Sequence, residues 1–423
     1  MKYFFPDSLD LVDPSFDFEQ ENRSPERVRH RDDQYAHELF SSPAYDGLLV
    51  SKGIVDGFGG SGSRYTLAQR HRLLRIGAQE FFRSSSLNLP IIGDCGAFTY
   101  VREPVPPYTV DEVIQFYEEC CFDFGISVDH VILTYQPKFD KLALIPDAIP
   151  LELQQRQEIT LQLATEFLAK NREMKLCFEP IGVAQGWSPQ SYAHSVQELQ
   201  KMGYTYIALG GMVPLKTKEI LAVLEAINEL RSPNTRLHLL GVTRTDHVGA
   251  FASYGVVSFD STSPLRQAFK DDKDNYYTLD RTYTAIRVPQ VDGNPRLQRL
   301  IVSGAVSQER ARQLEKSCLD ALRQYATGDC SLDQALDAIV TYDSFCEPKK
   351  NLREVYREVL TDRPWERCPC DICRRLGYHV ILFRGAERNR RRGFHNVWVF
   401  YRRLQRELGL LQDSITEAKG VLV

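Results

Sequence analysis

The densest group of potential metal ligands lies in the C-terminal part of the chain. Cys368, Cys370 and Cys373 form a Cys-x-Cys-x2-Cys motif, and His395 follows it. Three thiolates and one imidazole are the donors of a closed, tetrahedral Zn2+ site, which stabilises the fold and leaves no open position for catalysis. We therefore predict one structural Zn2+ held by these four residues. His379 is an alternative fourth ligand, since it lies closer to the cysteines in the sequence.

Two aspartates, each at the end of an apolar run, could perform glycosidic chemistry. Asp94 ends Ile-Ile-Gly-Asp, and Asp260 ends Val-Ser-Phe-Asp. Side chains at the C-terminal ends of barrel strands face the active site, where one carboxylate can attack an anomeric carbon while the other transfers protons. An aspartate after a strand also commonly turns the chain or caps the next helix. Both interpretations stay open for either residue taken alone.

Short apolar segments predict the strands that position these residues, and amphipathic helices separate them. Because parallel strands need a covering crossover helix, the alternation predicts an α/β fold. The strand candidates are Gly47–Ser51, Pro90–Asp94, Val128–Thr134, Lys175–Glu179, Tyr204–Leu209, Arg236–Gly241 and Val256–Asp260. The helix candidates are Leu67–Arg83, Val110–Phe124, Leu151–Lys170, Pro189–Lys201 and Lys216–Arg231. These strands fall one short of a (β/α)8 barrel, and the sequence does not locate the eighth.

The predicted fold class is α/β, a (β/α)8 TIM barrel with a zinc-binding subdomain and a helical insertion. A polar, weakly periodic N-terminal segment predicts an extended arm, and a helical block follows the last barrel strand. A final helix is expected at Asn396–Leu411. The expected domains are an arm at 1–45, a barrel core with the catalytic site at 46–306, a helical insertion at 307–361, and a zinc-binding subdomain with the C-terminal helix at 362–423.

Composition excludes several classes of protein. The chain has 423 residues, of which 43% are hydrophobic and 26% charged, and these proportions exclude disordered, collagen-like and coiled-coil proteins. No apolar run approaches the ~20 residues that span a bilayer, and no secretory leader is visible. We therefore expect a cytoplasmic protein without membrane association. Ten cysteines in that compartment are not expected to form a disulfide framework.

The charge is distributed unevenly. The net charge of −4 argues against a general nucleic-acid coat protein, yet Lys and Arg exceed Asp and Glu from Asn351 onward. The densest positive charge is formed by Arg388, Arg390, Arg391 and Arg392. Such a run could neutralise a phosphate backbone, although a solvated helix face is the alternative for each arginine. We expect these four residues to bind nucleic acid.

Further motifs carry a resemblance to a known family. In chain order they are Asp94-x-Gly96-x-Phe98, Gln185-Gly186, Gly210-Gly211, Gly241-Val242, Phe259-Asp260, the three-cysteine motif and His395-Asn396. This order resembles the tRNA-guanine transglycosylases, which are zinc-bearing TIM barrels that exchange guanine for a 7-deazaguanine. The resemblance extends roughly from Ile91 to Tyr401.

The resemblance implies a role for each matching residue. Asp260 would be the nucleophile, and Asp94 the general acid/base that also contacts the base. Phe98 and Leu240 would enclose the purine ring, while Gln185 and the backbone of Gly211 would bind its O6 edge. The implied substrate-binding residues are Phe98, Gln185, Gly210, Gly211, Met212 and Leu240, with Met212 near the 7-substituent.

Departures from the family pattern argue against the tRNA substrate and leave the base-exchange chemistry in place. Tyr135 takes the place of a second base-reading aspartate, and the basic segment that reads the anticodon in the tRNA enzymes is reduced to Pro264 and Arg266. The sequence is most similar to the DNA-modifying, DpdA-type branch. That likeness implies insertion of 7-cyano-7-deazaguanine (preQ0) into DNA through a covalent Asp–sugar intermediate, with an ATPase as a possible partner.

Three alternatives remain open. The chain could be a tRNA-guanine transglycosylase of the queuosine or archaeosine type, with an altered anticodon reader. It could be a catalytically silent family member that binds nucleic acid, although the presence of both Asp94 and Asp260 disfavours this. A barrel hydrolase with an unrelated zinc ribbon would incorporate no base at all.

Overall fold

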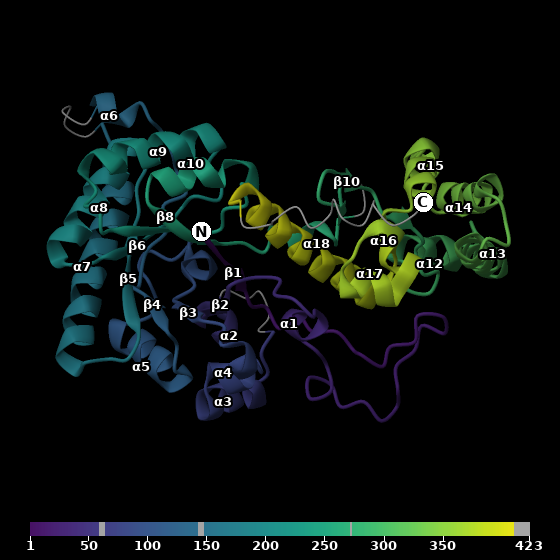
Figure 1. Ribbon diagram of the computed structural model, residues 1–423, viewed down its shortest axis with the longest axis horizontal. Coiled ribbons are helices and arrows are strands. Elements are labelled where there is room, and N and C mark those ends of the chain that lie inside the picture. Colours follow the sequence, from purple (N-terminus) through teal and green to yellow (C-terminus); the bar gives the residue numbers. More distant parts are fainter. Residues whose placement is uncertain (59–63, 143–147, 271–272, 410–423) are drawn as a thin grey trace, which may run out of the picture. The chain divides into compact units, whose positions relative to one another are not determined.

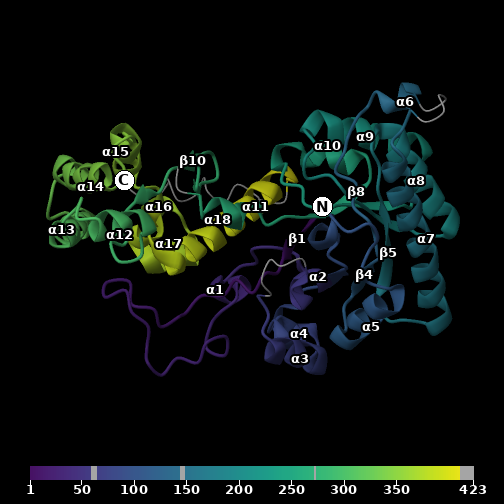
Figure 2. The ribbon, with the colours of Figure 1, turned by 180° about the vertical axis from the view of Figure 1, so that it is seen from behind.

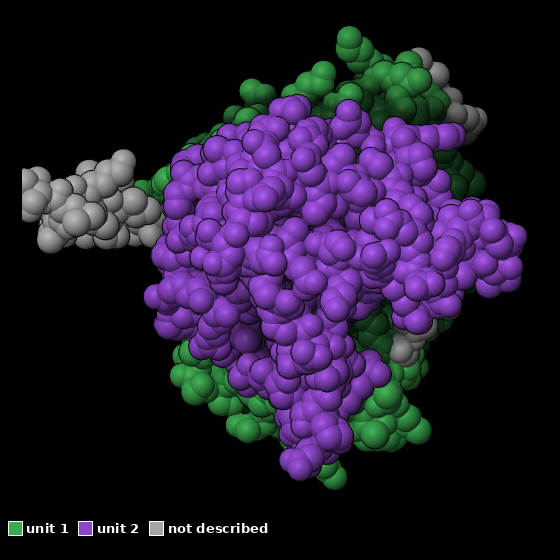
Figure 3. Space-filling view, turned by 90° about the vertical axis from the view of Figure 1, so that its right-hand side faces the viewer, with its two compact units in different colours: residues 1–9, 45–262, 403–423 green, residues 10–44, 263–402 purple. Residues whose placement is uncertain are grey.

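The computed structural model describes residues 1–58, 64–142, 148–270 and 273–409 (Figure 1 and, from behind, Figure 2). The chain forms two compact units, which are coloured separately in Figure 3. One comprises residues 1–9, 45–262 and 403–423, and the other comprises residues 10–44 and 263–402. Each unit is therefore built from segments that lie far apart in the sequence.

The first unit is a closed barrel of eight parallel strands, in sequence order around the barrel (Figure 1). The predicted (β/α)8 architecture is confirmed, because helices alternate with these strands along the chain. The strands are β1 (Lys2–Pro6), β2 (Gly47–Ser51), β3 (Ile91–Asp94), β4 (Phe124–Ile126), β5 (Glu179–Ala184), β6 (Tyr206–Leu209), β7 (Arg236–Leu239) and β8 (Val256–Asp260).

Strand β1 is the eighth strand, which the sequence did not locate. Its Phe4 pairs with Gly47 of β2 on one side and with Asp260 of β8 on the other. The expected arm at 1–45 therefore begins with a barrel strand, because the aromatic side chains of Tyr3 and Phe4 are buried. The segment was misassigned because residues 10–44, between β1 and β2, belong to the second unit, and their helix α1 (Ala36–Leu39) is too short to give a helical sequence pattern.

Two of the predicted strands were misplaced. Val128–Thr134 contains no strand; β4 is Phe124–Ile126, and the apolar run that follows it is a buried loop. A short apolar run cannot by itself distinguish a strand from another buried segment. Strand β5 begins at Glu179, where the predicted strand Lys175–Glu179 ends.

The barrel interior is filled by apolar side chains from six successive strands. Phe4, Leu49, Ile92, Ile126, Ile181, Val183, Tyr206 and Ala208 form one buried cluster. The barrel is thus a packed core and not a pore. A ligand must accordingly bind at the ends of the strands.

Sequence-encoded caps define the helices around the barrel. Thr109 begins α5 with a capping box to Glu112, and Ser188 caps α8 ahead of Pro189. Gly77, with φ of 74°, separates α3 from α4 and divides the predicted helix Leu67–Arg83. The helices of this unit are α2 (Lys52–Asp56), α3 (Leu67–Ile76), α4 (Ala78–Phe81), η2 (Ser85–Leu87), η3 (Ala97–Tyr100), α5 (Val110–Cys120), α6 (Phe139–Leu142), α7 (Leu151–Met174), α8 (Pro189–Met202), α9 (Thr217–Leu230), η4 (Thr245–His247) and α10 (Val248–Ser253).

The second unit is mainly helical. Helices α13, α14 and α15, which pack in succession (Figure 2), occupy the segment predicted as a helical insertion. The elements of this unit are α1 (Ala36–Leu39), α11 (Ser263–Gln267), β9 (Tyr276–Tyr277), β10 (Thr282–Tyr283), β11 (Ile286–Arg287), α12 (Pro295–Val302), α13 (Gln308–Thr327), α14 (Leu332–Cys346), α15 (Arg353–Asp362), α16 (Pro364–Arg367), α17 (Asp371–Leu376), η5 (Gly377–Ile381), β12 (Leu382–Phe383) and α18 (Gly385–Glu407), whose residues from Arg403 onward belong to the first unit. None of the helices in the described ranges is both long enough and apolar enough to cross a membrane.

Helix α18 differs from the expected C-terminal helix. It begins at Gly385 and ends at Glu407, whereas the sequence predicted Asn396–Leu411, whose last two residues lie outside the described ranges. Its first turns contact residues 10–44: the backbone N–H of Asp13 donates to Glu387 at 3.2 Å. This N-terminal segment is therefore held against α18 by hydrogen bonds.

Candidate active site

Five of the predicted site residues lie at the C-terminal ends of barrel strands. Asp94 ends β3 and Asp260 ends β8, while Gln185, Gly210 and Leu240 come directly after β5, β6 and β7. Because all strands of a parallel barrel end on the same side, these residues share one rim. The fold therefore brings together residues that are distant in the sequence.

Asp94 has the environment of a group that transfers protons near neutral pH. Its Oδ2 accepts a hydrogen bond from the backbone N–H of Gly96 at 2.9 Å. Burial, together with repulsion from Asp129 and Asp260, raises the pKa of Asp94 to about 7. Both protonation states are then populated at neutral pH, as a general acid/base requires.

Asp129 is a third carboxylate at the rim, and sequence reasoning missed it. Cys95 donates to its Oδ1 at 3.2 Å, and Gln185 donates to its Oδ2 at 2.6 Å. Burial raises the pKa of Asp129 to about 6, although these two hydrogen bonds oppose the rise. Since β4 ends at Ile126, the acidic residue that follows this strand is Asp129, and assigning the position to Tyr135 was wrong.

Cys95 connects Asp129 to the loop beyond β3. The hydroxyl of Tyr100 donates to the Cys95 sulfur at 3.0 Å, and the sulfur lies 3.2 Å from Asp129. Burial and the neighbouring carboxylates raise the pKa of the Cys95 thiol well above its usual value. The protonated thiol is thus a hydrogen-bond donor that orients Asp129.

The side-chain amide of Gln185 is fixed at both ends. Its Nε2 donates to Asp129, and its Oε1 accepts from the backbone N–H of Ile132 at 3.0 Å. A Cβ at Gly210 would collide with this amide, and one at Gly211 would collide with the carbonyl of Ile132. Gly211 also has φ of 69°, which favours glycine. The paired glycines therefore leave space for the Gln185 amide.

The three apolar residues predicted to bind the base differ in exposure. Phe98 lies on the turn η3 and is 50% exposed, so its ring is accessible for stacking. Leu240 is partly buried against the barrel core, and Met212 is buried. Enclosure of a purine by Phe98 and Leu240 remains a prediction.

Asp260 is held by donors from β7 and the residues after it. Its Oδ1 accepts from the backbone N–H of Gly241 at 3.0 Å and lies 3.2 Å from Nε2 of His238. Sequence reasoning did not identify His238, which occupies an interior position of β7 between apolar neighbours.

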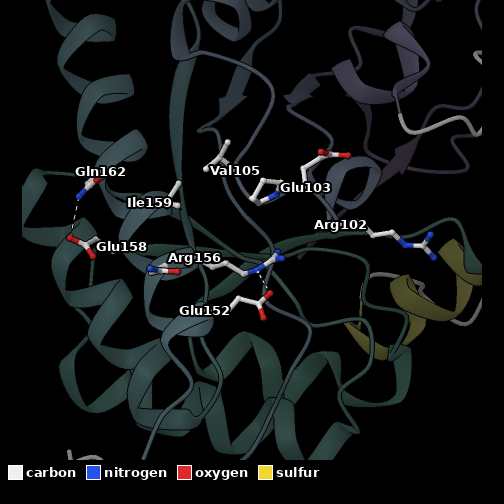
Figure 4. Close-up of a pocket in the computed structure, with 10 residues that line it drawn as sticks. Arg102, Glu103, Val105, Glu152, Arg156, Glu158, Ile159 and Gln162 are labelled. Carbon is white, nitrogen blue, oxygen red and sulfur yellow. Dashed lines mark hydrogen bonds and ion pairs between the residues drawn. The ribbon is translucent and has the colours of Figure 1, made fainter. Parts of the chain in front are cut away.

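A surface pocket of about 620 Å³ lies beside helix α7 (Figure 4). Its lining residues are Arg102, Glu103, Pro104, Val105, Glu152, Gln155, Arg156, Glu158, Ile159 and Gln162, and they include none of the three aspartates. Arg156 donates to the carbonyls of Val101 and Val131 at 3.1 and 3.0 Å and pairs with Glu152. It thereby ties the loops after β3 and β4 to α7.

The four predicted metal ligands cluster in the second unit. Ligand atoms of Cys368, Cys370, Cys373 and His395 all lie within 4.8 Å of one another, so the group could hold a metal ion. Nε2 of His395 donates to the carbonyl of Tyr277 at 2.8 Å, which leaves Nδ1 to face the sulfurs. The backbone N–H of Cys373 donates to the Cys370 sulfur.

His379, the alternative ligand, does not belong to this cluster. Its Nε2 lies 3.0 Å from Glu19, and Arg388 approaches its Nδ1 at 3.4 Å. Burial, reinforced by the positive charge of Arg388, lowers the pKa of His379 to about 4. Its ring is thus engaged by residues of the N-terminal segment and α18.

The structure contradicts the predicted nucleic-acid role of Arg392. This side chain is fully buried. Its guanidinium donates to the carbonyls of Ala268 and Leu382 at 2.6 and 2.8 Å and to Asn389 at 2.7 Å. A charge satisfied inside the second unit cannot contact a phosphate.

Arg388 and Arg391 are also buried, and this prediction was wrong for them too. Arg388 pairs with Glu21, and Arg391 pairs with Glu387 at 2.6 Å. Arg390 is partly exposed, although it donates to the carbonyl of Leu11 at 2.9 Å. The arginine run is therefore mainly structural.

We expect Asp94→Asn to raise stability most strongly in alkaline solution. The folded-state pKa of about 7 exceeds the ordinary value of 3.8, so between these pH values the folded protein keeps a proton that the unfolded chain loses. The wild type should therefore lose free energy of unfolding relative to the variant as the pH rises through this interval, by on the order of 4 kcal/mol. Urea unfolding below and above the interval measures the difference. Exposed Asp246→Asn is the control, and an Asp94→Asn effect independent of pH would contradict the prediction.

Comparison with known proteins supports the resemblance seen in the motifs. No protein-family model matches the chain. The sequence is 51% identical over 418 residues to a curated protein named DNA-guanine transglycosylase from Salmonella montevideo. The match covers 98% of this chain and 99% of the relative. On this near-complete similarity, the chain belongs to the DNA-guanine transglycosylase family.

Proposed function

We propose that this protein exchanges guanine in DNA for 7-cyano-7-deazaguanine, with Asp260 as nucleophile and Asp94 as general acid/base. The observation that carries the proposal is the rim at which Asp94, Asp129 and Asp260 meet, where burial and mutual repulsion raise the pKa of Asp94 to about 7. The name of the Salmonella relative supports DNA as the substrate.

The rim matches the hydrogen-bonding edge of guanine. Guanine and its 7-deaza analogues present N–H donors at N1 and N2 beside an O6 acceptor. Ionised carboxylates only accept hydrogen bonds, so Asp94 and Asp129 suit the N–H groups. The second N–H of the Gln185 amide and the backbone N–H of Gly211 would donate to O6. Adenine lacks the 2-amino group and would leave an acceptor unpaired.

The proposed exchange needs no reactant other than the two bases and the DNA sugar, since Asp260 and Asp94 are restored at the end. A carboxylate oxygen of Asp260 bonds to C1′ as the bond from C1′ to N9 breaks, and the base leaves with the electron pair. Asp94 donates a proton to the departing base. The incoming base then attacks C1′ from N9, Asp94 recovers a proton, and the Asp260 carboxylate is released.

A base in duplex DNA must meet one requirement that does not apply to a free nucleoside. A paired base must leave the stack to reach the rim, at a cost of a few kcal/mol. Exposed Phe98 could stack on the extruded base. An ATPase partner that opens the duplex would meet this cost, and we include it in the proposal.

Asp260→Asn should abolish the covalent adduct, because an amide cannot displace the base. Wild-type protein, incubated with a guanine-containing DNA oligonucleotide, should give an adduct that survives denaturing electrophoresis. The matched control is Asp246→Asn, which should form the adduct normally. Mass spectrometry of nucleosides from cells should detect the deazaguanine in DNA with wild-type protein and not with Asp260→Asn.

One outcome would overturn the nucleophile assignment, and another would overturn DNA as the substrate. An adduct formed by Asp260→Asn at the wild-type rate would exclude Asp260 as the nucleophile. Modified nucleosides found in tRNA and absent from DNA would instead favour the tRNA alternative.

We propose that the metal held by the Cys3His cluster is Zn2+ in a structural role. The donor set and the hydrogen bond from His395 to Tyr277 fit a closed tetrahedral site. When bound, Zn2+ would supply folding energy to the surrounding segment. The catalytic proposal involves no metal, since a closed site with four protein ligands leaves no open position for chemistry.

Loss of a ligand should remove both metal and stability. The zinc content of Cys370→Ser and of His395→Ala should be well below the roughly one equivalent expected for wild type. Both variants should also have lower melting temperatures. Plasma emission spectrometry of purified protein measures the metal content. His379→Ala, the matched control, should keep its zinc. Retention of zinc by His395→Ala, with loss in His379→Ala, would reverse the assignment.

We propose that DNA phosphates are contacted by exposed arginines beside the metal cluster. Arg367 and Arg375 are exposed and flank the cysteine motif. Replacing both with alanine should weaken DNA binding and lower the slope of log K against log salt by roughly one unit per lost contact. Arg392→Ala should instead reduce stability by ~1–3 kcal/mol for each buried acceptor that loses its donor. Filter-binding titrations over a salt series distinguish these effects, and an unchanged slope in the double variant would contradict the proposal.

A further inference from the structure

A chain of polar side chains leads from the barrel interior to the nucleophile. Nε2 of His238 lies 3.2 Å from Oδ1 of Asp260, and its Nδ1 lies 2.7 Å from the hydroxyl of Ser258. That hydroxyl is in turn hydrogen-bonded to Tyr206. The four residues lie on β6, β7 and β8, where His238 and Ser258 are register partners. The chain is therefore fixed by strand pairing.

The Asp260 carboxylate determines which group donates in each hydrogen bond of this chain. An ionised Asp260 only accepts, so Nε2 of His238 must carry the proton. Nδ1 of the neutral ring is then an acceptor, which the Ser258 hydroxyl satisfies, and Tyr206 donates to Ser258. Burial raises the pKa of Tyr206, which keeps its proton in place. The reverse order would set a nitrogen lone pair against the carboxylate.

The polar side chains of Tyr206, His238 and Ser258 lie in a part of the barrel that is otherwise apolar. His238 is fully buried, and Ser258 and Tyr206 are nearly so. The ring of His238 packs against the edge of Phe4, with centroids 6.2 Å apart. Buried polar groups are costly unless each is hydrogen-bonded. This packing and the two ring contacts leave the imidazole little freedom to rotate.

We propose that His238 is a positioning residue that fixes which oxygen of Asp260 attacks the sugar. Among the residues that the structure describes, His238 and Gly241 both donate to Oδ1, which assigns the attack on C1′ to Oδ2. The inference rests on the proposed role of Asp260 as the nucleophile.

The same hydrogen bonds assist the second half of the exchange. In the covalent intermediate Oδ2 is bonded to C1′ and Oδ1 is a carbonyl oxygen, which is a weaker acceptor than a carboxylate oxygen. The hydrogen bond from His238 to Oδ1 strengthens as the incoming base displaces Asp260, because the negative charge of the carboxylate is then restored. In this role His238 donates a hydrogen bond and transfers no proton.

Two substitutions at His238 separate positioning from packing. His238→Leu keeps an apolar side chain of similar size without a donor, and should lower kcat for exchange of radiolabelled guanine into a DNA oligonucleotide by ~10- to 100-fold. KM for guanine should change little, because His238 does not contact the base. His238→Gln offers an N–H to Asp260 and a carbonyl oxygen to Ser258, and should recover most of the rate. Tyr206→Phe, at the far end of the chain, should have a smaller effect.

Each outcome decides the proposal. A folded His238→Leu variant with wild-type kcat, or one in which only KM rises, would overturn it. A His238→Gln variant as slow as His238→Leu would make the role one of packing. Asp260→Asn is assayed in parallel for adduct formation. An adduct there would refute the nucleophile itself, whereas its absence beside a fully active His238→Leu would refute only the positioning role.

Discussion

Burial of carboxyl groups at one rim is the constraint on which the site depends. Closure of a parallel barrel brings the ends of β3, β4 and β8 to the same side. Burial and this proximity raise the pKa of Asp94 to about 7 and burial raises that of Asp129 to about 6. Buried carboxylates need hydrogen-bond donors, so the rim favours ligands that offer N–H groups in the pattern of guanine.

In the described part of the chain, each of the three carboxylates accepts a hydrogen bond, and none of them forms an ion pair with Lys or Arg. Gly96 donates to Asp94, Cys95 and Gln185 donate to Asp129, and Gly241 donates to Asp260. Neutral donors orient carboxylates while leaving their pKa values high, whereas a nearby arginine would lower them. An acid/base near neutral pH and a nucleophile with a defined orientation can therefore share one rim.

The sequence was sufficient for those site residues that follow a clear apolar strand. Asp94 and Asp260 were found for this reason, and the alternation of strands and helices predicted the barrel. Asp129 was missed because the buried loop after β4 is as apolar as a strand, which moved the expected strand end beyond it. Strand β1 was missed because a long segment of the second unit, with only the short helix α1, separates it from β2. His238 was missed because nothing in a strand sequence shows that an interior side chain reaches the end of the neighbouring strand.

The arginine run shows a limit of a different kind. The local excess of positive charge in the sequence predicted that Arg388 and Arg391 form a cationic surface. In the structure, Arg388 pairs with Glu21 of the N-terminal segment, and Arg391 pairs with Glu387 of the same helix. A local excess of charge predicts a surface for polyanions only when its counter-ions are not supplied from elsewhere in the chain. Residues 10–44 supply part of them here, so the segment predicted as an arm and the run predicted to bind DNA neutralise each other. Attraction for a phosphate backbone must then come from arginines outside this network, such as Arg367 and Arg375, which are exposed.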